Sequence, residues 1–374
     1  MKIITQICRF LLGGLFIFSG VVKINDPYGT AHMLVEYFEV FATDFTPLFH
    51  LLVPYSIQFS VLICAFELVV GIAILLQYDM RKTMWIALLM TLFFTFLTFY
   101  SYYFDKVKEC GCFGTVIPMT PQESFYKNLI TFPFLLVLFF QKNKLKTVLP
   151  DKSQHFIMGA LALGLLFTGY YITQHLPLID SLNYKVGNNI FKLTQPEEKA
   201  SYNWILAKDG KEYEFTDATY PTDTAYKYVR HSLVGDSTKL VPKIVGLRVE
   251  SEDGDATPEV FKGNKFLVVI PFPLKAKDAC EGTCMEKINK IIKSLENNKI
   301  GETMVLTSHA SATIFEEYRH GTQLAAPYYF VDETILKTMV RANPGTLLLK
   351  DGVVLGKWHY NDTPSPEIIS KLLE

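Results

Sequence analysis

Five long apolar segments in the first half of the chain constrain its fold more than any other feature. The hydrocarbon core of a bilayer is roughly 30 Å thick, which an α-helix crosses with about 20 apolar residues. Segments that meet or approach this length lie at residues 3–22, 55–77, 83–103, 123–140 and 154–173. We therefore predict five membrane-spanning helices.

The first and fourth segments are less clear than the others. The first could be a secretory signal peptide with Lys2 and Arg9 as its basic region. No small-residue cleavage site follows it, and Lys23 comes directly after the apolar run, so we favour a spanning helix. The fourth is the weakest because polar residues such as Lys127 interrupt it.

Charged residues are concentrated in the second half of the chain. Hydrophobic residues make up 49% of the 374 residues and the mean hydropathy is +0.20, but residues 1–175 hold most of the apolar side chains and residues 180–374 most of the charges. The net charge of −1 and the lack of a basic stripe with interleaved aromatic residues argue against a nucleic-acid partner. The composition predicts a membrane domain followed by a soluble region.

The Lys and Arg residues of the short loops predict the orientation, because cytoplasmic loops are enriched in them. One side of the membrane is flanked by Lys2, Arg81, Lys82, Lys142, Lys144, Lys146 and Lys152. The opposite side is flanked by Lys23, Lys106, Lys108 and Lys127. The first set is larger and places the N-terminus in the cytoplasm. An odd number of spans then places the loop after the third span and the C-terminal half outside, in the periplasm of a cell with two membranes.

The loop between the first two spans, residues 23–54, contains a short amphipathic pattern. Large apolar residues such as Met33, Tyr37 and Phe41 recur at helical spacing. Such a helix either lies along the outer interface or packs over the bundle. Asp26-Pro27 is expected to end the first span, because proline cannot continue a helix.

Two thiols one residue apart lie between the third and fourth spans, in Cys110-Gly111-Cys112. A disulfide across a single residue closes a small ring outside the relaxed geometry, so it should be easily reduced. Gly111 removes the Cβ that would obstruct this closure. The pair could accept electrons from a substrate and be reoxidised by a membrane quinone. It could also be a structural staple or bind a soft metal, although two cysteines do not complete a tetrahedral zinc site. We expect the redox role and no metal.

Cys280 and Cys284 form a second close pair, where a helix over residues 282–298 is expected to begin. A helix N-terminus lowers the pKa of a thiol and raises the thiolate fraction. Cys280 would then be the nucleophile and Cys284 the resolving thiol. The alternative is a structural disulfide. If both pairs are active, electrons pass between substrate thiols, the two pairs and a quinone, in either direction.

Ionisable residues within membrane spans are costly and often functional. Arg9 and Glu67 lie within the first and second spans. We expect either a buried ion pair between Arg9 and Glu67, or a role for Glu67 in moving a proton during quinone chemistry. Lys23, at the outer end of the first span, is expected to snorkel to the interface or to contact a quinone head group. Cys8 and Cys64 are interpreted as small hydrophobic residues without a function.

A set of motifs in the membrane half matches a known pattern. The matching features are Arg9, Gly13-Gly14, FIFSGVVKINDP at 16–27, Glu67, Gly71 and CGCFG at 110–114. Together they resemble the DoxX-like membrane proteins over residues 1–145, and more narrowly the MauE branch, which is linked to disulfide formation during methylamine dehydrogenase maturation. The resemblance implies a four-helix membrane core, similar also to the quinone-linked thiol oxidases of the vitamin K epoxide reductase type. Residues 150–176 would add a fifth, tethering helix.

Two further residues of the CGCFG motif have expected roles. Phe113 is a candidate contact for a quinone head group. Gly114, like Gly111 and Arg9, is expected to be structural.

The last part of the chain, residues 261–374, resembles a thioredoxin-like fold. The expected elements are strands at 265–272, 303–308 and 327–332, helices at 282–298, 311–320 and 333–342, a hairpin over 346–358 that turns at Asp351-Gly352, and a final helix. Thioredoxin-like proteins carry a cis-proline before this hairpin, and Pro344 matches its position. The chain departs from the family in its thiol motif, which has three residues between the cysteines where the family has two.

Residues 177–260 are expected to form a β-rich extension that packs onto the thioredoxin-like domain. The segment 203–215 predicts a hairpin around Asp209-Gly210, and 250–258 predicts an acidic loop or linker.

These observations predict a multidomain protein with an all-α membrane bundle and an extracytoplasmic α/β domain. The leading function is a membrane-bound thiol–disulfide oxidoreductase or protein-maturation factor that uses Cys110 and Cys112 with a quinone. Its partners would be the lipid bilayer and extracytoplasmic protein thiols or a client protein. A non-catalytic membrane scaffold and a subunit of a quinone-linked sulfur-compound oxidoreductase remain alternatives.

Overall fold

The computed structural model consists of two compact units, Met1–Leu182 and Asn183–Glu374, and each is described by itself. The structure describes residues 2–107, 113–114, 116–117, 119–150, 153–235, 239–280, 283–309 and 312–374. Cys110, Gly111 and Cys112 therefore lie outside the described residues, as does the side chain of Cys280.

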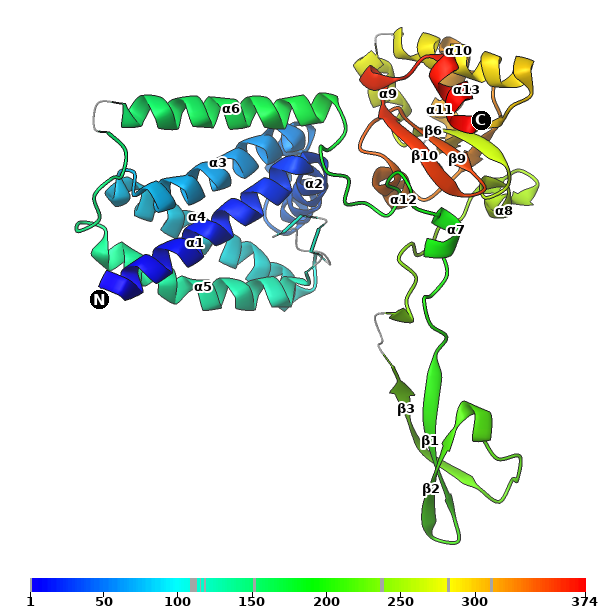
Figure 1. Cartoon of the computed structure of the whole chain (residues 1–374), viewed down its shortest axis with the longest axis horizontal. Coiled ribbons are helices and arrows are strands. Elements are labelled where there is room, and N and C mark those ends of the chain that lie inside the picture. Colours follow the sequence, from blue (N-terminus) through cyan, green and yellow to red (C-terminus); the bar gives the residue numbers. More distant parts are fainter. Residues whose placement is uncertain are drawn as a thin grey trace. The chain divides into compact units, whose positions relative to one another are not determined.

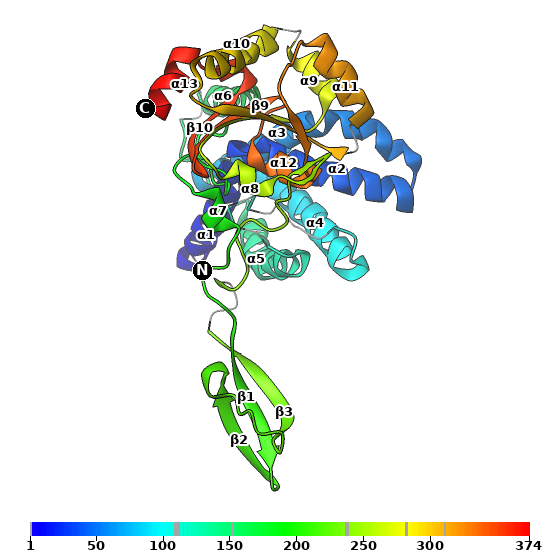
Figure 2. The ribbon, with the colours of Figure 1, turned by 90° about the vertical axis from the view of Figure 1, so that its right-hand side faces the viewer.

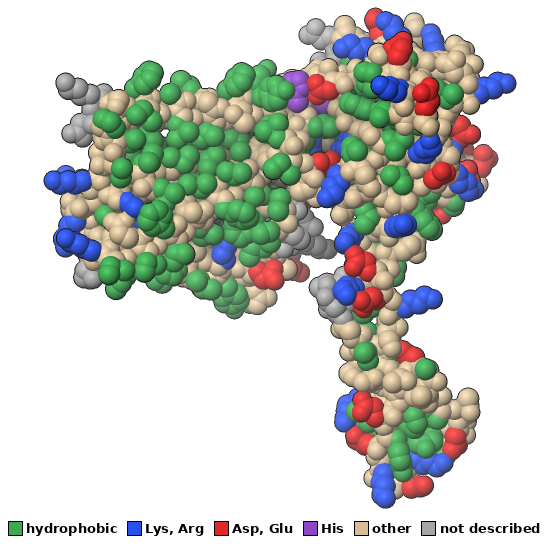
Figure 3. Space-filling view, in the orientation of Figure 1, with side chains coloured by type: hydrophobic (Ala, Val, Ile, Leu, Met, Phe, Trp, Pro, Cys, Tyr) green, Lys and Arg blue, Asp and Glu red, His purple; other side chains and the backbone are tan. Residues whose placement is uncertain are grey.

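The first unit is a bundle of long apolar helices that lie side by side (Figure 1). They are α1 (Lys2–Asn25), α3 (Ser56–Leu76), α4 (Met80–Phe104), α5 (Pro121–Gln141) and α6 (Gln154–Gln174). All five are long and apolar enough to cross a membrane, which confirms the predicted spans. Hydrophobic side chains cover the visible face of this unit (Figure 3), as expected for a surface that faces lipid.

The bundle is held together by a close approach of α1 and α3. A Cβ on Gly71 would lie 2.8 Å from the backbone nitrogen of Ile17, and a Cβ on Gly20 would lie 2.9 Å from the backbone nitrogen of Leu68. Small residues let helix backbones approach in this way in membranes. The result fixes the register of the two helices that carry the ionisable residues.

The loop between the first two spans forms two helices, α2 (Pro27–Asp44) and the 3₁₀ helix η1 (Pro47–Tyr55). Helix α1 ends at Asn25 and α2 starts at Pro27, as the Asp26-Pro27 pair predicted. One side of α2, including Leu34 and Tyr37, is buried, and the Ser60 hydroxyl of α3 donates a hydrogen bond to the Pro27 carbonyl. Helix α2 therefore packs against α3.

The second unit contains a seven-stranded sheet in the order β10-β9-β6-β7-β8-β4-β5. The strands are β4 (Glu250–Ser251), β5 (Gly254–Asp255), β6 (Asn264–Ile270), β7 (Glu302–Thr307), β8 (Tyr328–Phe330), β9 (Gly345–Lys350) and β10 (Val353–His359). The pairs β6–β7 and β7–β8 are parallel, whereas β9 runs antiparallel to β6. A β–α–β unit is thus followed by a β-hairpin and a helix.

Helices cover both faces of this sheet. They are α8 (Thr257–Val260), α9 (Pro273–Cys280), α10 (Thr283–Asn298), α11 (Ala312–Gly321), α12 (Glu333–Met339) and α13 (Pro366–Leu373). Phe266 and Val268 pack with Ile288 of α10 and Ile369 of α13 in one core. Figure 2 shows α10 and α13 on one side of the sheet and α12 on the other. These residues confirm the expected α/β domain, and α9 is a helix that the sequence pattern missed.

The extension forms a separate three-stranded sheet in the order β2-β1-β3. Its strands are β1 (Ser201–Lys208), β2 (Lys211–Thr216) and β3 (Lys227–Val234), with a short helix α7 (Ile190–Leu193) before them. The hairpin predicted at Asp209-Gly210 is present, and both residues have positive φ. The acidic segment 250–258 was wrongly predicted as a loop or linker. Glu250 pairs with Phe330, so β4 and β5 extend the seven-stranded sheet.

Candidate functional site

A buried ion pair joins α1 to α3 inside the membrane unit. The Lys23 Nζ donates to Glu67 Oε2 at 2.7 Å, and their side chains are only 7% and 8% exposed. The expected pairing of Glu67 with Arg9 is wrong, and so is the expectation that Lys23 snorkels to the interface. The reason is the length of α1, which continues past residue 22 to Asn25 and keeps Lys23 on the face that meets α3.

Arg9 lies at the other end of the same helix and has a different neighbour. The amide of Gln77, which follows α3, is oriented to accept from Arg9 Nη1 and to donate to the Lys146 carbonyl. The Arg9 guanidinium also lies 4.6 Å from the ring centroid of Phe10. Arg9 therefore ties the end of α3 to α1, which agrees with a structural role.

A polar cavity of about 40 Å³ adjoins the Lys23–Glu67 pair. It is lined by Leu15, Phe16, Ser19, Lys23, Glu67, Thr91, Phe94, Lys127, Asn128 and Thr131. The Nδ2 atom of Asn128 is buried and has no hydrogen-bond partner among the residues that the structure describes. Among the described residues that line it, lysine and amide side chains supply hydrogen-bond donors and Glu67 supplies a carboxylate.

The described end of the CGCFG motif lies beside this cavity. Phe113 is buried and packs edge-on against Phe18 of α1, with 5.4 Å between ring centroids. The Nζ of Lys127, which also lines the cavity, lies 4.6 Å from the Phe113 ring centroid. Gly114 has a positive φ of 56°, and a Cβ there would lie 3.2 Å from Val22. These contacts fix Phe113 and Gly114, which directly follow Cys112 in the sequence, against the C-terminal part of α1.

A second cavity, of about 50 Å³, lies under α2 and shares Lys23 and Phe94 with the polar cavity. Its other lining residues are Thr30, Met33, Leu34, Tyr37, Ile63, Phe93, Leu97 and Thr98. Phe93 is 53% exposed on the apolar surface of α4. The apolar cavity therefore lies between the lipid-facing side of the bundle and the Lys23–Glu67 pair.

The two single cysteines of the spans are buried free thiols. The Sγ of Cys64 lies 3.8 Å from Thr30 Oγ1 and 3.9 Å from Ser60 Oγ, and Cys8 belongs to an apolar core with Leu12. Both fit the expectation of small packing residues.

The second thiol pair lies between two helices of the α/β domain. Cys280 is the last residue of α9, whereas Cys284 is the second residue of α10. The expected position of Cys280 at a helix N-terminus is therefore wrong, because an unforeseen helix ends there. Cys284 is disulfide-bonded and 5% exposed within the main core. This burial suits a structural crosslink better than an exchanging thiol.

Pro344 lies where the resemblance placed it. The Asn343–Pro344 peptide bond is cis. The Asn343 side chain donates to the Phe272 carbonyl at 2.8 Å and accepts from the Phe272 nitrogen. These bonds hold the segment before β9 against the segment between β6 and α9.

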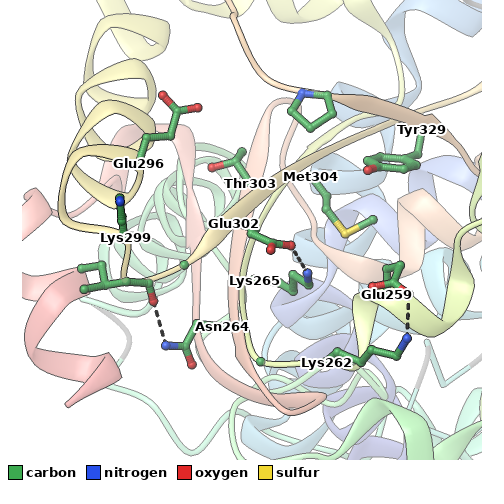
Figure 4. Close-up of a pocket in the computed structure, with 14 residues that line it drawn as sticks. Glu259, Lys262, Asn264, Lys265, Glu296, Lys299, Glu302, Thr303, Met304 and Tyr329 are labelled. Atoms are coloured by element: carbon green, nitrogen blue, oxygen red, sulfur yellow. Dashed lines mark hydrogen bonds and ion pairs between the residues drawn. The ribbon is translucent and has the colours of Figure 1, made fainter.

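A large cavity of the α/β domain lies at the C-terminal end of α10, away from Cys284 at its N-terminal end. It has a volume of about 790 Å³ and is lined by the first residues of β6 and β7, including Asn264, Lys265 and Glu302 (Figure 4). Helix α9 follows the opposite end of β6. Lysines and glutamates of this cavity pair with each other, as Lys262 does with Glu259 at 2.7 Å. Among the described residues, the lining of this cavity includes neither Cys284 nor any residue of α9.

The polar interior of the helix bundle was not identified from the sequence as a candidate site. Ser124, Asn128 and Thr131 recur at positions i, i+4 and i+7 of α5, a spacing that places them on one helix face. This polar stripe lies in the least clearly predicted of the five spans. Together with Lys23, it was the sequence pattern that could have revealed the site. It indicated that α5 faces a polar interior.

The fold and the site agree with a class of integral membrane proteins. Residues 1–141, which contain the helices α1 to α5, match the family model described as "Methylamine utilisation protein MauE", so the membrane part of the chain is similar to that family. Residues 200–234 match a domain of unknown function.

A curated relative extends the comparison. The chain is 29% identical to "Protein TlpB" of Flavobacterium psychrophilum over 163 residues, which are 43% of this chain and 42% of the relative. The chain therefore matches less than half of that protein's length. No solved structure matches the chain significantly.

Proposed function

We propose that this protein is a membrane-bound thiol–disulfide oxidoreductase or maturation factor that passes electrons between extracytoplasmic thiols and a membrane quinone through Cys110 and Cys112. The observation that carries the proposal is the position of Lys127. Its Nζ contacts the ring of Phe113, which follows Cys112, and lines the cavity of the Lys23–Glu67 pair. The thiol motif is thereby connected to a buried site that holds both a proton donor and a proton acceptor.

The electrons and protons of the proposed reaction balance between the Cys110/Cys112 pair, a substrate dithiol and a quinone. When a Cys110/Cys112 dithiol is oxidised, two S–H bonds break, one S–S bond forms, and two electrons and two protons leave. A quinone takes up the same two electrons and two protons and becomes a quinol. Exchange with a substrate dithiol restores the reduced pair through a mixed disulfide.

The charges of the short loops support an extracytoplasmic location for the thiols. Lys23 and Lys127 line the interior of the bundle, so the outer loops keep only Lys106 and Lys108 of the four residues counted on that side. The bias of Lys and Arg toward the cytoplasmic side becomes stronger. We propose that the N-terminus is cytoplasmic and that the α/β unit is periplasmic.

The strand order of the α/β unit supports a thioredoxin-like domain. Strands β10, β9, β6 and β7 are adjacent in that order, with β6 parallel to β7 and antiparallel to β9. This is the βαβ–ββα arrangement that we propose as thioredoxin-like, with the cis peptide at Asn343–Pro344 before its hairpin.

The experiment that tests the function is thiol trapping in intact membranes with a maleimide reagent under denaturing conditions. Cys8 and Cys64 are free and take one adduct each in every state, so they serve as an internal standard. When respiration is blocked, Cys110 and Cys112 should stay reduced, so the wild type should gain one maleimide adduct on each of them. The increase should disappear in the Cys110→Ser/Cys112→Ser variant. Adduct numbers that do not respond to respiration would refute the proposal.

A second candidate for the soluble half is a non-catalytic binding domain. The buried disulfide of Cys284 favours it. In the same trapping experiment Cys284 should then stay unlabelled whether or not respiration is blocked. Labelling that follows the Cys110/Cys112 pair would instead place this thiol in the relay.

A further inference from the structure

The two cavities that meet at Lys23 have complementary chemistry. The polar cavity presents ammonium groups from Lys23 and Lys127 and the unpartnered Nδ2 of Asn128. A ligand that enters it must therefore offer hydrogen-bond acceptors. The cavity under α2 is lined mainly by apolar and aromatic side chains such as Leu34, Ile63 and Phe94. A ligand that occupies both must combine an acceptor group with a flat or flexible apolar body.

The position of the apolar cavity indicates where such a ligand comes from. Phe93 forms part of its wall and is 53% exposed on the bundle surface. The five spans place this surface in lipid. A ligand that reaches Lys23 by this route is dissolved in the bilayer and does not come from water.

We infer that the apolar cavity under α2 and the Lys23 side chain form the head-group site of a membrane quinone. This inference rests on the proposed function and specifies where its electron acceptor binds. A quinone carbonyl accepts hydrogen bonds and does not donate them, which fits the donor-rich side, and its ring and tail fit the apolar side. Lys23 donates to a carbonyl oxygen, and Glu67 holds Lys23 in position through the 2.7 Å ion pair.

The size of the cavity requires one side chain to move. An apolar cavity of about 150 Å³ binds benzene in an engineered protein, whereas this one measures about 50 Å³. Met33 lines the cavity and is its most adaptable residue, because methionine is unbranched and has three rotatable bonds. A change of the Met33 rotamer that moves this side chain out of the cavity is therefore the expected response to a bound ring.

The test is photolabelling of the full-length protein in nanodiscs with an azido-benzoquinone that carries a short isoprenoid tail, followed by peptide mapping. We expect label in α2, α3 or α4, on residues 30–37, 63 or 93–98. Leu34→Trp fills the cavity and should weaken competition by unlabelled quinone by about tenfold or more, equivalent to 1.4 kcal/mol. The matched control is Leu89→Trp, which adds the same ring at a side chain that is 63% exposed and should leave binding unchanged.

A second variant protects the test against misfolding. Met33→Ala enlarges the cavity, so quinone should bind more tightly, and loss of structure cannot produce that gain. Label elsewhere in the chain, or equal competition in Leu34→Trp, Met33→Ala and the control, would overturn the inference.

The experiments distinguish failure of the quinone site from failure of the proposed thiol oxidoreductase function. Binding should persist in the Cys110→Ser/Cys112→Ser variant, because the site uses no thiol. Label at the site with redox-inert cysteines would refute the function and keep the site. Redox-active cysteines together with label elsewhere in the chain would refute the site and keep the function.

Discussion

At the scale of single residues, the Lys23–Glu67 pair is the least predictable feature and the one with the most consequences. Both residues were recognisable as costly in a span, but their partnership depends on the register of α1 against α3. That register is set by Gly20 and Gly71, where any side chain would meet the neighbouring helix. A sequence shows which residues need a partner and does not show which partner is within 3 Å.

Removing one member of this pair should cost more than removing both. Lys23→Met leaves the buried Glu67 carboxylate without its partner, so we expect a loss of about 3–5 kcal/mol in the free energy of unfolding. The double variant Lys23→Met/Glu67→Leu should recover most of that loss, because no uncompensated charge remains. Thermal unfolding in detergent measures both. A double variant as unstable as the single one would contradict this account.

Asp217 makes the stability of the three-stranded sheet depend on pH in the acidic range. The indole N–H of Trp204 and then the backbone N–H of Tyr202 donate to its carboxylate and hold the pKa of Asp217 below its ordinary value of 3.8. A lowered folded-state pKa means that the stabilisation is present above the unfolded-state pKa and is lost as the pH falls through the folded-state value.

We therefore expect the fluorescence of Trp204 to change only below about pH 3.8, the ordinary carboxyl value. The measurement needs Trp85 and Trp358 replaced by Phe, since those are the other tryptophans of the chain. Asp217→Asn should remove the transition. A transition of equal size in that variant would assign it to another group.

At the scale of elements, the sequence predicted most of the helices and strands, because their periodicity is local. The spans follow from hydropathy, and the hairpin at Asp209-Gly210 follows from residues that accept positive φ. Helix α9 was missed because it is only eight residues long and ends at Cys280, which is too short for a clear helical pattern. The strands β4 and β5 were missed because each has two residues and because β4 joins the sheet through a long-range pairing with β8, that of Glu250 with Phe330.

The close packing of α1 against α3 predicts that alanine substitutions at two glycines change the stability of the protein in opposite directions. Gly71→Ala places a methyl group 2.8 Å from the Ile17 backbone, so we expect overpacking to cost about 1–3 kcal/mol. Gly14→Ala meets nothing within 4 Å and should stabilise the helix by up to about 1 kcal/mol. Melting temperatures in detergent compare the two. Equal shifts would mean that the helices do not pack as described.

At the scale of the whole molecule, the predicted division into a membrane part and an α/β part is confirmed, with the boundary at Leu182 and Asn183. The shift from apolar to charged composition was sufficient to find it. Composition could not show that residues 250–255, which belong to the extension in sequence, are part of the C-terminal sheet.

The orientation across the membrane is testable with reporter fusions. Alkaline phosphatase, which folds only outside the cytoplasm, should be active when fused after Glu374 and inactive when fused after Asp79, in the loop before α4. Green fluorescent protein at the same two positions should give the opposite pattern. Phosphatase activity after Asp79 would reverse the orientation and place the thiols in the cytoplasm.

The sequence by itself determined what depends on short-range pattern: the number of spans, the α/β character of the second half, and the residues whose chemistry is unusual for their place. Hydropathy, turn residues and helical spacing are all readable within a few residues of chain. The tertiary structure decided which of those residues meet. Lys23 reaches Glu67 across 44 positions and Lys127 reaches Phe113 from α5, because close helix packing selects one register and thereby one set of buried partners.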